Sequence, residues 1–138
     1  NYELFYVDLW GVVHNGVSLH QEAIKALNEM KRVLYVLDHK ERSISQSAYL
    51  GDLLVTCYSL HSRNRRFGNF IGKGYSVEAT KSAMNMVAEG YNATNCIHEL
   101  LTKESYNSES PIITATYNIL YKEADPKEEI EALSSLIS

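Results

Sequence analysis

The spacing of apolar residues predicts helices over most of the chain. From residue 50 onward, apolar positions recur three and four residues apart, which places them on one face of a helix. Several of these stretches follow residues that cap helices well, because a serine or aspartate oxygen accepts from the exposed amides of a first turn. We therefore expect short helices over about 50–57, 62–72, 76–87, 92–103, 110–123 and 125–137. Together they predict an all-α domain.

The first 38 residues have a different pattern. "LFYVDLWGVV" is rich in β-branched and aromatic residues and ends near a turn signal at Asn15-Gly16, which predicts a strand. Ser18 and Gln21 form a capping box that opens a helix. "RVLYVLD", residues 32–38, is a short apolar run that we interpret as a second strand. The apolar stripe of the helix between them is Ala23, Ile24, Leu27 and Met30.

The predicted fold class is therefore mainly α, with two parts. Residues 1–47 are expected to form a βαβ-like N-terminal unit and a polar linker, and residues 48–138 the all-α domain. Two strands and one helix bury too little apolar area to be stable alone. We expect the N-terminal unit to dock on another part of the protein.

Composition excludes several functional classes. The 138 residues are 45% hydrophobic and 22% charged, which argues against disorder, and the net charge of −4 argues against general nucleic-acid binding. No apolar run is long enough to span a bilayer, and the first residues lack a signal peptide, so we expect a cytoplasmic protein. Cys57 and Cys96 lack metal-ligand spacing; we expect two reduced, partly buried thiols and no metal site.

The densest positive charge lies in "SRNRR", residues 62–66. A solvated basic patch on a helix would explain it. However, Arg63 and Asn64 fall in the first turn after the Ser62 cap, where free amides and the helix dipole attract anions. Arginine is unfavourable at that positive end unless an anion is nearby. A guanidinium, an amide and a hydroxyl suit a phosphate, so we expect a phosphate or similar dianion as ligand.

Asp52 also has two interpretations. An aspartate before an apolar helix is commonly a cap. The functional alternative is an acid that orients a substrate hydroxyl or a lysine ammonium.

The segment "LGDLLVTCYSLHSRNRRFG" resembles the signature of the C-terminal domain of bacterial NAD(P)-dependent glycerol-3-phosphate dehydrogenase. "VAEGYNAT", residues 87–94, is similar to that family's next motif, and "SPIITATYNILYKEADPKEEIEALSS" to its closing helices. The resemblance covers about residues 50–138 and implies a fold like the C-terminal domain of 6-phosphogluconate dehydrogenase. It also implies hydride transfer between NAD or NADP and a three-carbon phosphate.

The resemblance implies roles for particular residues. Those for glycerol 3-phosphate or dihydroxyacetone phosphate are Asp52, Ser62, Arg63 and Asn64. Those for the nicotinamide cofactor are Arg63, Val87 and Glu89.

Two parts of that family's machinery are missing from the 138 residues. No GxGxxG dinucleotide fingerprint occurs, and no lysine stands in a matching catalytic motif. We therefore expect little or no turnover from this chain alone, because the hydride donor is not positioned. The expected partners are the small-molecule substrate and either a separate nucleotide-binding domain or a second copy of the chain.

The N-terminal "LFYVDLWGVVHNG" resembles the opening strand and loop of haloacid-dehalogenase-like hydrolases. The resemblance implies Asp8 as a phosphatase nucleophile, but Trp10 replaces the usual second aspartate. A phosphohydrolase using Asp8 is thus one alternative function. A helical domain that binds phosphate metabolites or docks on a partner without catalysis is another.

Overall fold

The computed structural model describes residues 21–39, 59, 61–86 and 88–137. Every regular element in this described part is a helix, as the pattern of residues 62–138 predicts. In chain order the elements are α2 (Gln21–Asp38), α4 (Arg63–Gly72), α5 (Val77–Ala83), α6 (Glu89–Lys103), the 3-10 turn η2 (Asn107–Glu109), α7 (Pro111–Tyr121) and α8 (Pro126–Ile137). No described helix is long and apolar enough to cross a membrane.

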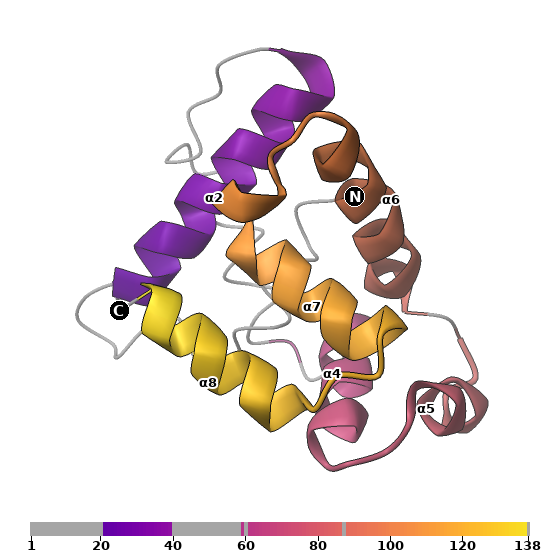
Figure 1. Cartoon of the computed structure of the whole chain (residues 1–138). Coiled ribbons are helices and arrows are strands. Elements are labelled where there is room, and N and C mark those ends of the chain that lie inside the picture. Colours follow the sequence, from indigo (N-terminus) through magenta and orange to yellow (C-terminus); the bar gives the residue numbers. More distant parts are fainter. Residues whose placement is uncertain (1–20, 40–58, 60, 87, 138) are drawn as a thin grey trace.

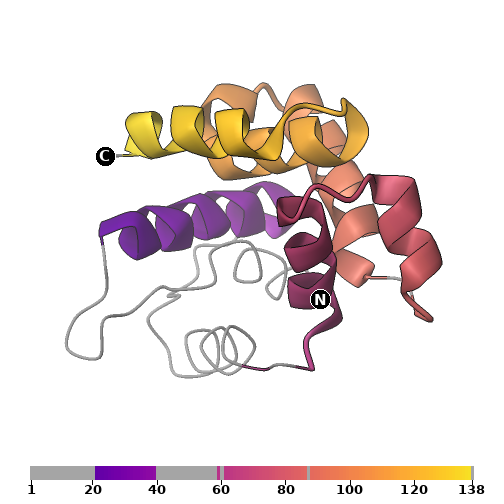
Figure 2. The same cartoon turned by 90° about the horizontal axis from the view of Figure 1, so that it is seen from below.

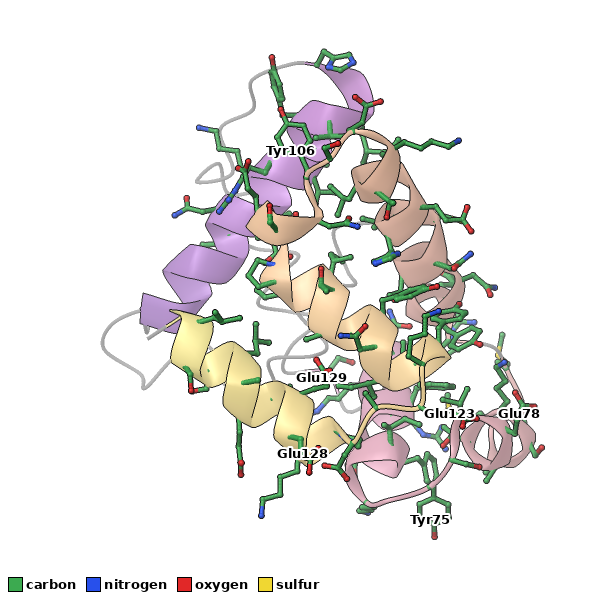
Figure 3. All side chains as sticks on the ribbon, viewed as in Figure 1. Tyr75, Glu78, Tyr106, Glu123, Glu128 and Glu129 are labelled. Carbon is green, nitrogen blue, oxygen red and sulfur yellow. The ribbon has the colours of Figure 1, made fainter. Side chains whose placement is uncertain are left out.

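Helix α7 lies at the centre of the arrangement and packs against both α6 and α8 (Figure 1). Turned by 90°, the molecule shows α8 on one side and α2 beneath it, with α4 and α5 together at one end (Figure 2). Tyr75 and Glu78 mark that end, and Tyr106 marks the opposite one (Figure 3).

The main core joins α2 to α6, α7 and α8 through fully buried aliphatic side chains. Removing such side chains from water is the principal source of stability for the packing. The buried members are Met30, Val33, Val36, Ile97, Leu101, Ile112, Ile113, Ala115 and Leu133.

A second, smaller core holds α4 against the start of α6 and the end of α7. Its buried members are Phe67, Ile71, Ala88 and Ile119. Phe67 and Ile71 are four residues apart and so share one face of α4. Because Ala88 immediately precedes α6, this packing brings the first turns of α4 and α6 together.

A buried carboxylate caps the first turn of α7. The side chain of Glu29, from the middle of α2, is only 2% exposed. Its two oxygens accept from the backbone amides of Ile112 and Ile113, each at 3.0 Å. These amides have no partner within the helix, and a carboxylate there also matches the dipole. The interaction ties α2 to α7 across more than eighty residues of sequence.

Serine and aspartate capping was predicted correctly in three places. Ser62 and Ser76 accept from the amides of Arg65 and Ala79 at the starts of α4 and α5. Asp125 Oδ1 accepts from two amides in the first turn of α8. Ser110 precedes α7 as predicted, but within the described residues its hydroxyl makes no capping bond, since Glu29 takes that role.

The predicted strand over residues 32–38 is wrong, because these residues continue α2 to Asp38. The run is too short for its apolar spacing to separate a strand from a buried helix. Tertiary packing decides: Val33 and Val36 face the core three residues apart, whereas Tyr35 and Leu37 are exposed. In a strand, Val33 and Val36 would point to opposite faces of the sheet, because successive side chains alternate.

Other boundaries differ by a few residues. Helix α5 ends at Ala83 and α6 begins at Glu89, so the predicted helix over 76–87 is too long and the next one starts too late. Cys96 is exposed rather than partly buried. The predicted strand near residues 4–13, the helix at 50–57, Cys57 and the boundary between residues 47 and 48 lie outside the described residues.

We predict that Glu29→Gln lowers the free energy of unfolding by about 2–3 kcal/mol, because one buried amide of α7 loses its charged acceptor and faces a donor instead. Urea denaturation followed by circular dichroism measures the loss. Glu109→Gln is the matched control, since Glu109 also joins α2 to the α7 side, through an exposed 3.5 Å contact with Arg32. That variant should lose less than about 1 kcal/mol. Equal losses in the two variants would contradict the assigned role of Glu29.

Candidate functional site

The candidate site is the meeting point of two helix starts. Helix α4 begins at Arg63 and α6 begins at Glu89. The Ser62 hydroxyl accepts from the Arg65 amide at 3.2 Å and so fixes the first turn of α4. That turn projects Arg63 and Asn64 toward α6. Each helix contributes the positive end of its dipole, so the junction favours negative charge.

Two polar contacts connect these helix starts. The guanidinium Nη2 of Arg63 lies 3.2 Å from Glu89 Oε1. The amide N–H of Gly90 donates to Asn64 Oδ1 at 2.9 Å. Asn64 thereby caps α6 from another helix, where the preceding residue, Ala88, carries no polar side chain.

The Arg63–Glu89 ion pair is open to solvent. The exposed fractions of the two side chains are 41% and 69%. Water screens such a pair, and its contribution to stability is usually below about 1 kcal/mol. A ligand with a stronger negative charge can therefore compete with Glu89 for the guanidinium.

A cavity of about 340 Å³ adjoins the junction. Asn64 and Gly90 line it at the junction, and Phe67, Ile119 and Ile130 contribute apolar walls from α4, α7 and α8. Its mixed lining joins a polar end, formed by the helix starts, to an apolar floor.

An aromatic stack runs along α6 and α7 and begins at the start of α6. We use this name for Tyr91, Tyr121, Tyr117 and His98, whose rings follow one another along α6 and α7. Successive ring centroids lie 4.6, 5.2 and 3.7 Å apart. The Tyr121 hydroxyl donates to the Tyr91 carbonyl at 2.7 Å, and burial raises the pKa of that hydroxyl.

The two ends of the aromatic stack carry charged neighbours. The Lys81 ammonium lies 4.0 Å from the centre of the Tyr91 ring, a cation–π contact. At the other end, burial lowers the pKa of His98, the Lys122 ammonium lowers it further, and Glu99 raises it. Sequence reasoning missed this stack. The spacing of Tyr117 and Tyr121 by four residues was its available signal.

Four of the residues singled out from the sequence come together here. They are Ser62, Arg63, Asn64 and Glu89. Asp52, Val87 and Asp8 lie outside the described residues. Among the residues described, no three of His, Cys, Asp and Glu are grouped as a metal site. The arrangement presents hydrogen-bond donors and positive charge, which suits an anion.

Comparison with known proteins identifies relatives that match most of the chain. A family model described as NAD-dependent glycerol-3-phosphate dehydrogenase C-terminus matches residues 17–131. Glycerol-3-phosphate dehydrogenase (NAD(P)+) of Francisella tularensis subsp. novicida is 37% identical over 119 residues, which make up 86% of this chain and 35% of that protein. The corresponding protein of Francisella philomiragia is 36% identical over the same number of residues.

A solved structure is similar as well. The crystal structure of glycerol-3-phosphate dehydrogenase from Coxiella burnetii superposes with a TM-score of 0.75 and 28% sequence identity, over 96% of this chain and 41% of that one. The chain thus spans about a third of the length of the curated relatives it matches. The family match includes α2, and the comparisons give no support to a haloacid-dehalogenase-like N-terminal piece.

We predict that His98 titrates below the usual value of 6.5 in the folded chain, which proton-detected NMR of the imidazole measures. Lys122→Gln should raise this pKa by removing a repulsive charge, and Glu99→Gln should lower it by removing an attractive one. Since the unfolded chain takes up the proton first, His98 stabilises the fold above about pH 6.5 and this contribution is lost as the pH falls through the folded pKa. Shifts of the same sign in both variants would contradict the assignment.

Proposed function

This chain belongs to the NAD-dependent glycerol-3-phosphate dehydrogenase C-terminus family, and from that premise we propose that it binds the three-carbon phosphate on which such an enzyme acts. The ligand would be sn-glycerol 3-phosphate or dihydroxyacetone phosphate. The reaction would be their NAD(P)-dependent interconversion, for which this chain supplies the substrate-binding helical domain.

One observation carries the proposal: Arg63 and Asn64 of α4 meet the first residues of α6. A guanidinium and a carboxamide can both donate to phosphate oxygens, and the neighbouring helix starts reinforce negative charge. Glu89 supplies one negative charge to Arg63 through an exposed contact. A phosphate dianion would supply more charge and two acceptor oxygens for the planar guanidinium, so it would compete well for Arg63.

Ser62 would act chiefly by shaping the first turn of α4. Its hydroxyl oxygen accepts from the Arg65 amide, which fixes the direction of the two side chains that follow it. Asp52 would contact the glycerol part of the substrate, a role that rests on the family resemblance alone.

The cofactor proposed is NAD or NADP, with contacts from Arg63, Val87 and Glu89. The side chains of Arg63 and Glu89 fit this role because both reach solvent at the junction, one as a donor and one as an acceptor. The nicotinamide, when bound, supplies the hydride chemistry at C2 of the substrate. The chain's own residues would hold the phosphate and keep C2 in place relative to the cofactor.

The hydride step would need a nucleotide-binding domain beyond the residues seen here. The 138 residues contain no GxGxxG fingerprint, which in dinucleotide-binding domains lets the backbone approach the pyrophosphate. The matched segment is about a third of the length of the curated relatives, so we propose that the nucleotide is bound by a part of the enzyme outside these 138 residues.

We predict that Arg63→Ala weakens binding of sn-glycerol 3-phosphate at least about tenfold, because a charge-assisted bidentate contact is lost. Isothermal titration calorimetry at low salt measures the dissociation constant. Arg66→Ala is the matched control, because Arg66 is exposed on the same helix and its substitution removes the same charge. The affinity of this variant for sn-glycerol 3-phosphate should stay within about twofold of that of the parent chain. Equal weakening in both variants would indicate general electrostatic attraction and would contradict a specific clamp.

We also predict that the chain alone does not oxidise NADH in the presence of dihydroxyacetone phosphate, because the hydride donor is not held next to the substrate. Absorbance at the NADH band follows the reaction. A rate above background that disappears in Arg63→Ala would refute the need for a separate nucleotide-binding domain while supporting the anion clamp.

A further inference from the structure

The carboxamide of Asn64 has an orientation that chemistry alone determines. Its neighbour across the junction is the backbone N–H of Gly90, 2.9 Å away. A backbone N–H can only donate, so the atom that faces it must be the carboxamide oxygen, Oδ1. The Nδ2 group then points away from Gly90 and carries two hydrogens to donate.

This bond has structural reasons to persist. Helix α6 follows Ala88, which has no polar side chain of its own, so the bond to Asn64 satisfies an amide in the first turn. Gly90 is buried, and leaving its N–H without a partner would cost stability. Phe67 and Ala88 pack in the same small core and hold the two helix starts at this separation.

We propose that the Gly90 amide is a positioning group that turns the donor Nδ2 of Asn64, rather than its acceptor Oδ1, toward the ligand. This inference rests on the proposed function and specifies the chemistry of that site. Arg63, beside Asn64, can only donate. With Nδ2 presented to the ligand, the two side chains of α4 are therefore suited to ligand oxygens that accept.

The consequence is a preferred direction for the substrate. At neutral pH a phosphate dianion presents acceptor oxygens only, whereas a glycerol hydroxyl both donates and accepts. The phosphate end would face Arg63 and Asn64, and the hydroxyl end would face away from α4. A ligand that keeps the phosphate but lacks the hydroxyls should still bind, and glycerol should not.

Asn64→Asp separates the structural role of this side chain from its ligand role. The aspartate keeps an acceptor for Gly90 and suits the positive end of α6, so the fold should be at least as stable. It loses both Nδ2 donors and adds a negative charge beside the phosphate. We expect binding of sn-glycerol 3-phosphate, measured by calorimetry, to weaken about ten- to a hundredfold. Asn64→Ala should lose both the bond to Gly90 and the donor.

Asn92→Asp is the matched control. Asn92 is exposed in the second turn of α6, and the substitution adds the same charge near the same helix start without touching the Gly90 bond. Affinity should change less than about threefold. An equal loss in Asn92→Asp and Asn64→Asp would overturn the donor role of Asn64, because added charge alone would then explain both.

Amide NMR of the labelled chain tests the orientation without any ligand. Gly90 N–H should exchange slowly with solvent in the parent chain and in Asn64→Asp, and at least about tenfold faster in Asn64→Ala. Equal exchange in all three would overturn the positioning role. If Gly90 responds as expected and the parent chain binds neither sn-glycerol 3-phosphate nor inorganic phosphate, the proposed function fails and the donor role fails with it, while the orientation stands.

Discussion

The helical arrangement depends on one contact, in which the carboxylate of Glu29, from α2, caps the first turn of α7. Helix α7 lies between α6 and α8 and contributes to both cores, so its position sets the position of its neighbours. Glu29 fixes its beginning by two charged hydrogen bonds in a dry environment. Such bonds are directional, whereas aliphatic packing tolerates small sliding. The buried acid therefore gives α7 a defined register against α2.

The site inherits that register through the small core. Ile119, near the far end of α7, packs with Phe67, Ile71 and Ala88. This contact sets the distance between the starts of α4 and α6, and with it the contacts of Arg63 and Asn64. Polar side chains at the junction are thus positioned by apolar ones a turn or two away. The aromatic stack along α6 and α7 adds a second brace at Tyr91.

The site is organised around donors at helix starts. One exposed carboxylate, Glu89, balances the guanidinium, and one carboxamide oxygen satisfies the Gly90 amide. Helix α4 then presents the donors of Arg63 and Asn64 to a ligand. In the proposed phosphate site, the backbone dipoles and these two side chains would act together.

Residue spacing along the sequence was enough to predict the helices at Ser62, Ser76 and Asp125, because a cap and its amides lie within three residues of one another. It also marked Arg63 and Asn64 as unusual, since arginine at a helix start opposes the dipole. The run at residues 32–38 could not be resolved this way, because its short apolar pattern fits a strand or a buried helix equally. Only packing against α6 and α7 decided that it is helix.

The sequence by itself determined the helices that begin after Ser62, Ser76 and Asp125, and it marked the side chains proposed to hold an anion, because both follow from local spacing and residue chemistry. The tertiary structure alone decided which helix starts meet. Asn64 finds its partner 26 residues away and Glu29 finds its partners more than 80 residues away. No local pattern encodes such pairings, because they depend on how apolar faces of separate helices pack and therefore on the whole fold at once.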